Sequence, residues 1–169
     1  MMSRRRRLVL GAVAVASAAA GGWWASRRDA PSDAEQRLWA AQFATPDGGT
    51  LSLAAFHGRP LVLNFWATWC APCVREMPTL DRFRREFAPA GWQVIGLAID
   101  RADAVKDFLK RTPVGFPIGL AGLEGADLAR DFGNDRGGLP FTAVFDARGR
   151  QVERHLGETH YEQLLAWAR

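Results

Sequence analysis

The chain has 169 residues, a length that suits one folded domain plus an N-terminal extension. Its formal net charge is +4, but the excess lies in residues 1–28, which contain six arginines and no acidic residue. The remaining 16 basic and 18 acidic residues leave residues 29–169 slightly acidic. This distribution argues against a nucleic-acid partner, which would favour a basic folded surface.

The N-terminal segment has the composition of an export signal. An arginine run at 4–7 precedes an uncharged stretch over residues 8–25, and small-residue sites such as Ala16-Ser17-Ala18 lie within that stretch. A cleaved signal peptide and a retained anchor both remain open, because the stretch is only just long enough to span a bilayer. The arginine run also fits a twin-arginine export pattern loosely, so the export route is open as well.

We therefore assign residues 1–28 to a signal peptide or membrane anchor, residues 29–37 to a linker and residues 38–169 to the folded domain. This organisation predicts a periplasmic or otherwise extracytoplasmic protein. If the N-terminal segment is retained, it would anchor the protein to the inner membrane. Membrane association is expected only through residues 8–25.

In the first half of the domain the sequence alternates between strand, turn and helix patterns. The turn signal PDGG at 46–49 separates apolar segments at 38–43 and 51–53, which predicts a β-hairpin. A continuous apolar run at 61–66 predicts a central strand that is buried on both faces. Three further elements are expected: a helix over 72–87, a buried strand over 92–99 and an amphipathic helix over 102–111.

The second half predicts short strands and helices. They are a strand at 116–120, a helix at 126–132, strands at 141–145 and 151–156, and a last helix that follows a capping box of Thr159 and Glu162. Strands that alternate with helices predict an α/β fold with a mixed central sheet and helices on both faces. The opening hairpin is expected to extend this sheet at one edge.

Cys70 and Cys73 are the only two cysteines, and they lie in the sequence WCAPC. No metal site is expected, since a structural zinc needs four ligands and the three histidines are scattered along the chain: His57, His155 and His160. Covalent haem attachment would need a histidine where Val74 stands. A structural disulfide that closes so short a loop would add little stability. These exclusions favour a redox couple.

The surroundings of the pair also favour redox chemistry. Cys70 follows a buried strand and begins a helix, where main-chain N–H groups and the helix dipole stabilise a thiolate. Pro72 fits the first turn of that helix, where its missing N–H costs nothing. We expect Cys70 to be the exposed nucleophile and Cys73 to be the thiol that resolves a mixed disulfide. No cofactor is expected beyond the redox-active Cys70–Cys73 disulfide.

These residues resemble the thioredoxin superfamily and, within it, the TlpA/ResA-like thiol–disulfide reductases. The resemblance spans about residues 38–169 and rests on NFWATWCAPC at 64–73, Glu76, Pro78, GLPFT at 138–142, and the segments DGGTLSL and HGRPLVLNFW. It implies a thioredoxin-like fold with an added N-terminal hairpin, and disulfide exchange with protein thiols and disulfides. It also implies a membrane-bound electron donor and a task such as cytochrome c or oxidase assembly.

The resemblance also implies which residues form the active site. It implies a cis peptide bond before Pro140, beside the cysteines, and an active-site surface shaped by Trp69, Ala71 and Pro72. In thioredoxin itself the position of Asn64 holds an aspartate, which accepts a proton from the couple. An asparagine cannot accept that proton, so another group is needed.

Helix geometry nominates Glu76 as the replacement. At about 100° per residue, Glu76 falls about 60° from Cys73 and lies on the apolar side of the helix, the side of Met77, Leu80, Phe83 and Phe87. A carboxyl group there is costly unless it has a task or a partner. We expect Glu76 to be catalytic, as the proton acceptor for Cys73. The alternative is a partly exposed glutamate paired with an arginine.

The leading interpretation is an exported thiol–disulfide oxidoreductase that reduces protein disulfides. No histidine lies between the two cysteines, which favours a reductant over a strong oxidant. The alternative is a copper-binding assembly factor that uses the same dithiol, since thiolates bind Cu(I). A peroxidase is disfavoured, because Ala67 stands where the threonine of such a site would be. Trp66 and Trp69 are expected to shape the surface around the couple, whereas three other tryptophans are expected to be structural: Trp39, Trp92 and Trp167.

Overall fold

The computed structural model describes residues 30–169, and Asp33 to Arg169 form one folded unit. A seven-stranded sheet lies at its centre, in the order β2-β1-β5-β4-β3-β6-β7. The strands are β1 (Gln42–Ala44), β2 (Thr50–Ser52), β3 (Leu61–Trp66), β4 (Gln93–Ala98), β5 (Ile118–Leu120), β6 (Phe141–Phe145) and β7 (Gln151–Leu156). Strand β4 runs parallel to β3 and β5, and the remaining neighbours pair antiparallel, so the predicted mixed sheet is confirmed.

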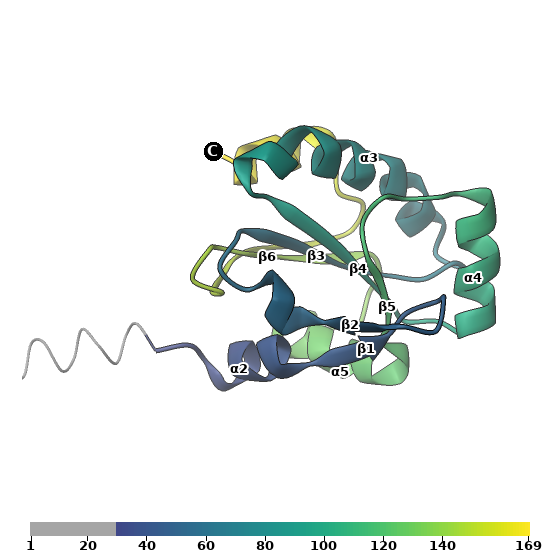
Figure 1. Ribbon diagram of the computed structural model, residues 1–169, viewed down its shortest axis with the longest axis horizontal. Helices are drawn as coiled ribbons and strands as arrows, with labels where there is room; N and C mark the ends of the chain where they lie inside the picture. Colours follow the sequence, from purple (N-terminus) through teal and green to yellow (C-terminus); the bar gives the residue numbers. More distant parts are fainter. Residues whose placement is uncertain (1–29) are drawn as a thin grey trace, which may run out of the picture. The chain divides into compact units, whose positions relative to one another are not determined.

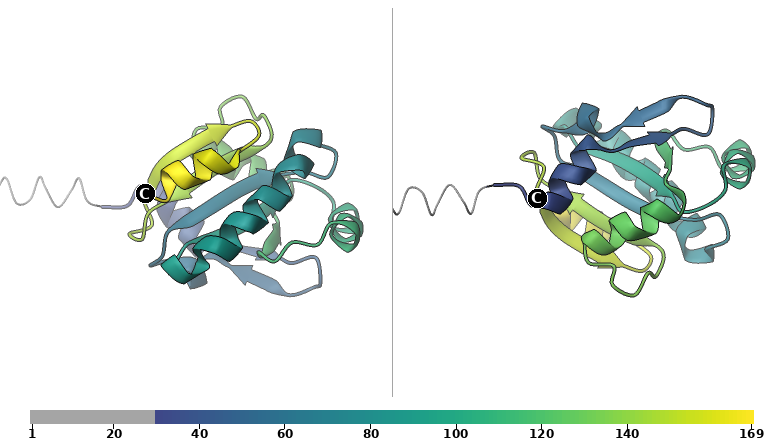
Figure 2. Two further views of the ribbon diagram at one scale, coloured as in Figure 1. Left: turned by 90° about the horizontal axis from the view of Figure 1, so that it is seen from above. Right: turned by 90° about the horizontal axis from the view of Figure 1, so that it is seen from below.

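Helices cover both faces of the sheet, as the alternation of elements predicts (Figure 1). They are α2 (Asp33–Ala40), α3 (Ala71–Phe87), α4 (Ala102–Arg111), α5 (Gly122–Asp131) and α6 (Tyr161–Trp167), with short 3₁₀ turns η1 (Leu53–Phe56) and η2 (Ala88–Ala90). Figure 2 shows α3 and α6 on one face of the sheet, and α2 and α5 on the other. No helix within residues 30–169 has the length and apolar character needed to cross a membrane.

Strand β3 is buried along its whole length and separates two apolar clusters. Its side chains alternate between the faces of the sheet, as in any strand. Leu61, Leu63 and Phe65 pack in the cluster that includes residues of α2 and α5. Val62 and Trp66 pack in the cluster that includes residues of α3 and α6. Asn64 lies between these two in sequence and places a polar group on the α3 side.

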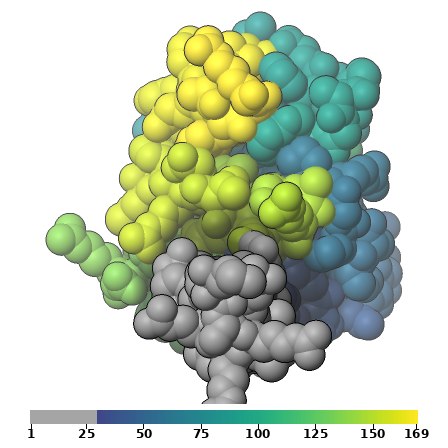
Figure 3. Space-filling model, turned by 90° about the vertical axis from the view of Figure 1, so that its left-hand side faces the viewer, coloured from purple at the N-terminus to yellow at the C-terminus, as the bar shows by residue number. Residues whose placement is uncertain are grey.

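Helix α6 contacts α3 through side chains near the C-terminal end of α3. The Arg82 guanidinium lies 3.9 Å from the centre of the Tyr161 ring, and the Tyr161 hydroxyl donates a hydrogen bond to Glu86. Figure 3 shows α6 at the surface beside the C-terminal part of α3. The segment that leads into α6 is thereby held close to α3.

The predicted linker over 29–37 is wrong in its second half, because a helix begins at Asp33. One buried side chain and two hydrogen bonds explain why this polar stretch folds. Leu38 is fully buried, Trp39 donates from Nε1 to Gly149 O at 2.8 Å, and the Glu35 carboxylate accepts from Gln151 N at 2.8 Å. The strand of the hairpin therefore starts at Gln42 and not at Leu38.

Two helix starts in the second half also differ from the prediction. Helix α5 begins at Gly122, four residues before the expected start. Helix α6 begins after His160, whose main-chain N–H donates to the Gln163 side chain at 2.9 Å, so Thr159 is not the capping residue. Thr159 instead turns its hydroxyl inward, to within 3.1 Å of Thr142 Oγ1. The export signal or anchor predicted for residues 1–28 lies outside the described residues.

Candidate active site

The two cysteines lie where β3 gives way to α3, and they form a disulfide with a Cα–Cα distance of 5.3 Å. Cys70 is the N-cap of α3, and its sulfur accepts a hydrogen bond from Cys73 N at 3.3 Å. Cys70 retains 6% of its surface exposed, whereas Cys73 is fully buried. Cys70 is thus less exposed than predicted, but it is the one cysteine of the pair that retains any exposed surface.

Glu76 follows the pair by one turn of α3, and only 1% of its surface is exposed. Its Oε1 accepts from Asn64 Nδ2 at 2.7 Å, and its Oε2 accepts from Thr159 N at 2.7 Å. Burial raises the pKa of Glu76 from its ordinary value of 4.5 to about 7, although these two hydrogen bonds oppose the rise. The alternative of a partly exposed glutamate paired with an arginine is therefore wrong.

The hydrogen bonds of Glu76 belong to a buried polar group that also includes Asn64, Thr142 and Thr159. Asn64 Nδ2 donates to Thr142 Oγ1 at 3.1 Å as well as to Glu76. Asn64 and Thr142 lie directly opposite each other in the antiparallel pair of β3 and β6, so their side chains point to the same face. Within the described chain, Asn64 Oδ1 is buried without a hydrogen-bond partner.

Neither threonine was predicted as a site residue, and Thr159 was expected only to cap the last helix. The signal for Thr142 was its place two residues after Pro140 in the predicted strand, which puts it at the end of β6 that adjoins the thiols. Thr159 gave no such signal, because its contact with Glu76 is made by a main-chain N–H across 83 residues.

Pro140 directly precedes β6 and follows the cis peptide bond that the resemblance implies. The Leu139–Pro140 peptide bond is cis. Phe141, the next residue, pairs with Phe65 near the end of β3. Pro140 therefore lies at the end of the sheet where β3 leads into the segment that carries Cys70.

The surface around Cys70 is formed by Trp69, Ala71 and Pro72, of which Trp69 and Ala71 are exposed and Pro72 is half-buried. The prediction that Trp66 also shapes this surface is wrong, since Trp66 is fully buried against Phe108.

The loop that carries Trp69 is fixed by a residue that the sequence analysis did not single out. Asp100 follows β4, and its Oδ2 accepts from both the main-chain N and the hydroxyl of Thr68, at 2.8 and 2.6 Å. A groove of about 460 Å³ lies next to this loop.

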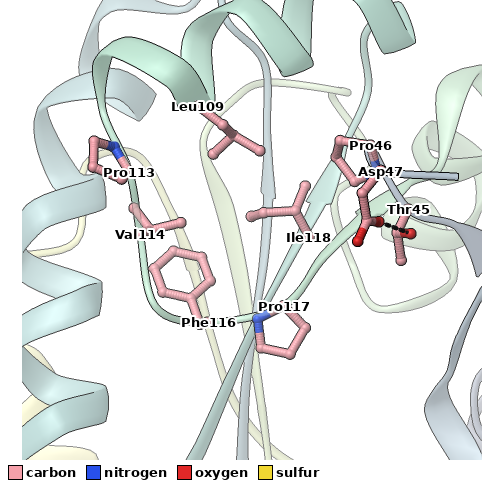
Figure 4. Close-up of a pocket in the computed structure, with 9 residues that line it drawn as sticks. All are labelled: Thr45, Pro46, Asp47, Leu109, Pro113, Val114, Phe116, Pro117 and Ile118. Atoms are coloured by element: carbon pink, nitrogen blue, oxygen red, sulfur yellow. Dashed lines mark hydrogen bonds between the residues drawn. The ribbon is translucent and has the colours of Figure 1, made fainter. Parts of the chain in front are cut away.

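A second hollow, of about 410 Å³, is built by other elements (Figure 4). Its lining is mostly apolar, and its one carboxylate, Asp47, accepts a hydrogen bond from Thr45. None of the thiols or their hydrogen-bonded neighbours lines it. Residues 30–169 contain no cluster of three or more His, Cys, Asp or Glu side chains arranged to hold a metal ion.

Comparison with known proteins agrees with this geometry. The family model described as Redoxin matches residues 30–165. The thiol-disulfide oxidoreductase ResA of Bacillus thuringiensis subsp. konkukian is 33% identical over 119 residues, which is 70% of this chain and 66% of that protein. The protein of the same name from Bacillus subtilis is 32% identical over 75 residues, or 44% of this chain and 42% of that protein. The chain thus spans slightly less than two thirds of the first of these relatives.

Solved structures show the same fold. The thioredoxin-related protein from Neisseria meningitidis serogroup B is 31% identical, with a TM-score of 0.66 over 75% of this chain and 95% of that one. A thiol:disulfide interchange protein of the thioredoxin family from Chlorobium tepidum is 29% identical, with a TM-score of 0.65 over 76% of this chain and 92% of that one. A secreted thiol-disulfide isomerase from Corynebacterium glutamicum is 26% identical, with a TM-score of 0.68 over 78% and 82%. The chain therefore belongs to the redoxin family and has a thioredoxin-like fold.

Proposed function

We propose that this protein acts outside the cytoplasm and reduces disulfides of other proteins through the Cys70–Cys73 couple. The observation that carries the proposal is the arrangement at the start of α3. The sulfur of Cys70, which is 6% exposed, caps the helix, the fully buried Cys73 follows it, and a buried carboxyl with a pKa of about 7 lies one turn further on.

The reaction starts from the reduced protein. The Cys70 thiolate, stabilised by the helix terminus, attacks one sulfur of a substrate disulfide. That disulfide breaks, its other sulfur leaves as a thiolate, and a mixed disulfide joins Cys70 to the substrate. Cys73 then attacks the Cys70 sulfur and the substrate departs with its second thiolate. Two electrons have passed to the substrate, and the protein holds the Cys70–Cys73 disulfide.

Glu76 accepts the proton that the Cys73 thiol loses in the second step. Cys73 is buried, so its thiol cannot pass a proton directly to bulk water. A neighbouring carboxylate with a pKa near neutrality can take that proton as Cys73 attacks. Asn64 and the Thr159 N–H hold the two carboxylate oxygens in place for this step.

The direction and the location are inferred from the sequence and from the relatives. The Ala71-Pro72 dipeptide between the cysteines offers no histidine to stabilise the Cys70 thiolate further, which favours reduction of substrates over their oxidation. Residues 1–28 have the composition of an export signal, and the Corynebacterium glutamicum protein is described as secreted. An exported reductant needs a supply of electrons, for which we propose a membrane-bound donor, and assembly of cytochrome c or an oxidase is the proposed task.

Trapping of the mixed disulfide tests the proposal. With Cys73→Ser, attack on a substrate disulfide should proceed while resolution is blocked, so adducts accumulate through Cys70. Non-reducing gels and mass spectrometry would detect the adducts, and Cys70→Ser is the matched control that should form none. Adducts in Cys70→Ser alone would reverse the assignment of the nucleophile. Failure of the reduced wild-type chain to reduce insulin disulfides would contradict the proposed activity.

A further inference from the structure

The segment that leads from β7 into α6, residues 157–160, is joined to α3 by two contacts that lie side by side. Arg75 and Glu76 are adjacent on α3, and Glu158 and Thr159 are adjacent on the segment. Arg75 donates to Oε2 of Glu158 from Nε at 3.0 Å and from Nη2 at 2.6 Å. Thr159 N donates to Oε2 of Glu76 at 2.7 Å. The ion pair therefore lies next to a hydrogen bond that supports the carboxyl group of the candidate site.

The same segment is attached to the sheet on its other side. Gly157 N donates to Pro140 O at 2.9 Å, at the start of β6. His155, on β7, has its Nε2 within 3.3 Å of Glu158 O. The ion pair with Arg75 thus completes the attachment on the side of α3.

Glu158 also places a negative charge near Glu76. Burial is the main cause of the raised pKa of Glu76, and the hydrogen bonds from Thr159 and Asn64 oppose that rise. The charge of Glu158 adds to the rise, because a nearby negative charge disfavours ionisation of a carboxyl group. The guanidinium of Arg75 offsets the charge of Glu158, so its loss would favour the protonated form of Glu76.

We propose that Arg75 is a positioning residue that acts on Glu76. Through its ion pair with Glu158 it holds residues 157–160 against α3 and offsets a negative charge, and both effects favour the ionised form of Glu76. The inference rests on the proposed function, in which the ionised carboxylate accepts the proton of Cys73. Arg75 acts through its neighbours and not on the sulfur atoms.

Titration of Glu76 in the oxidised full-length chain tests the proposal without any substrate. Neither Cys70 nor Cys73 titrates while the disulfide is formed. The signal of Glu76 is identified as the carboxyl ¹³C signal that Glu76→Gln removes. Arg75→Met should raise the pKa of Glu76 and increase its proton affinity about threefold, the size expected from a partly exposed ion pair. Arg75→Lys, which keeps the positive charge, should restore most of the wild-type value.

Glu158→Gln distinguishes the effect of charge from a merely structural effect. Its amide oxygen can still accept from Arg75 while the negative charge is gone, so the pKa of Glu76 should fall. Arg82→Met is the matched control, because Arg82 lies on the same helix, is 56% exposed against 60% for Arg75, and also pairs with a glutamate. It should leave the pKa of Glu76 at the wild-type value. His155 is present in all of these variants, so its own titration cancels in the comparison.

An unchanged pKa of Glu76 in Arg75→Met would overturn the inference. An equal rise in Arg82→Met would overturn it too, as would a rise in both Arg75→Met and Glu158→Gln. The pH–rate curve of resolution by Cys73 separates the inference from the proposed function. A curve that moves with the pKa of Glu76 supports both. A changed pKa with an unchanged curve supports the action of Arg75 and contradicts Glu76 as the proton acceptor.

Discussion

Asn64 on β3 donates a hydrogen bond of 2.7 Å from its side-chain amide to Oε1 of Glu76 on α3. Thioredoxin, which this chain resembles, has an aspartate at the position of Asn64. Here a neutral amide occupies that position and the carboxyl group comes from the helix. In the proposed mechanism the two residues divide the task, since Asn64 orients the carboxyl group and Glu76 accepts the proton of Cys73.

The raised pKa of Glu76 predicts a specific loss of stability with rising pH. An acid whose pKa is higher in the folded than in the unfolded state favours the folded state while it is protonated, so this stability is full below pH 4.5 and is lost as pH rises to about 7. A rise of the pKa from 4.5 to about 7 corresponds to roughly 3 kcal/mol. Glu76→Gln should remove this loss. Urea unfolding of the oxidised wild type and variant at pH 4.5 and 8 measures it, and an unchanged pH slope in the variant would contradict the burial argument.

Glu76→Gln should also slow disulfide exchange while the fold remains intact. In the wild type, the rate of resolution by Cys73 should rise with pH through an apparent pKa near neutrality, which belongs to the coupled carboxyl and thiol. The variant lacks a base, and a lost general base costs about 10²-fold or more. Stopped-flow measurement of the pH–rate curves tests this effect. Superimposable curves would leave Glu76 with a structural role only.

Asn64→Leu should raise the pKa of Glu76 further. The substitution keeps a similar volume but removes the hydrogen bond that favours the ionised carboxylate. A hydrogen bond to a charged group contributes about 1.5–3 kcal/mol, so a rise of about one unit or more is expected. The Glu76 carboxyl ¹³C signal reports the titration. Thr142→Val is the control, because it removes a neighbour of Asn64 and leaves the hydrogen bond from Asn64 to Glu76. If Thr142→Val raised the pKa of Glu76 as much as Asn64→Leu does, the assignment would be contradicted.

Helix α2 sets the N-terminal limit of the stable domain. Deletion of residues 1–29 should leave a cooperative unfolding transition, since the described core begins after them. Deletion of residues 1–41 should destabilise the domain strongly, because it removes Leu38 and the hydrogen bond of Trp39 to Gly149. Within the full chain, Leu38→Ala alone should cost about 2–5 kcal/mol. Chemical denaturation followed by circular dichroism distinguishes these cases, and equal stability of both truncated forms would contradict this role of α2.

The sequence predicted the elements that have a strong local pattern. The apolar runs of β3 and β6 and the amphipathic pattern of α4 required no knowledge of their neighbours, and the periodicity of α3 was enough to place Glu76 on its buried side. Helix α2 was missed because DAPSDAEQR is polar and its buried apolar residues, Leu38 and Trp39, come at its end. Its contacts with Gly149 and Gln151 are more than 100 residues away in the chain.

The polar group and the groove could not be predicted for a related reason. The hydroxyl of Thr159 fits a helix cap in sequence, but Thr142 offers it a buried partner, and that partner is visible only once β6 and α6 are placed. Leu123 lay outside the predicted helix, in a stretch with no distinctive pattern. Its position beside Trp69 depends on where α5 starts relative to the loops that follow β3 and β4.

The partner of Glu76 Oε2 is a main-chain N–H, and this has a consequence for sequence variation. Any amino acid except proline supplies that N–H at position 159, so the contact tolerates nearly every substitution that leaves the path of the chain intact. The contact of Oε1 depends on one side chain, Asn64. A substitution at position 159 can therefore keep the main-chain contact while it removes the buried hydroxyl that faces Thr142, whereas most substitutions at position 64 remove the contact with Oε1 itself.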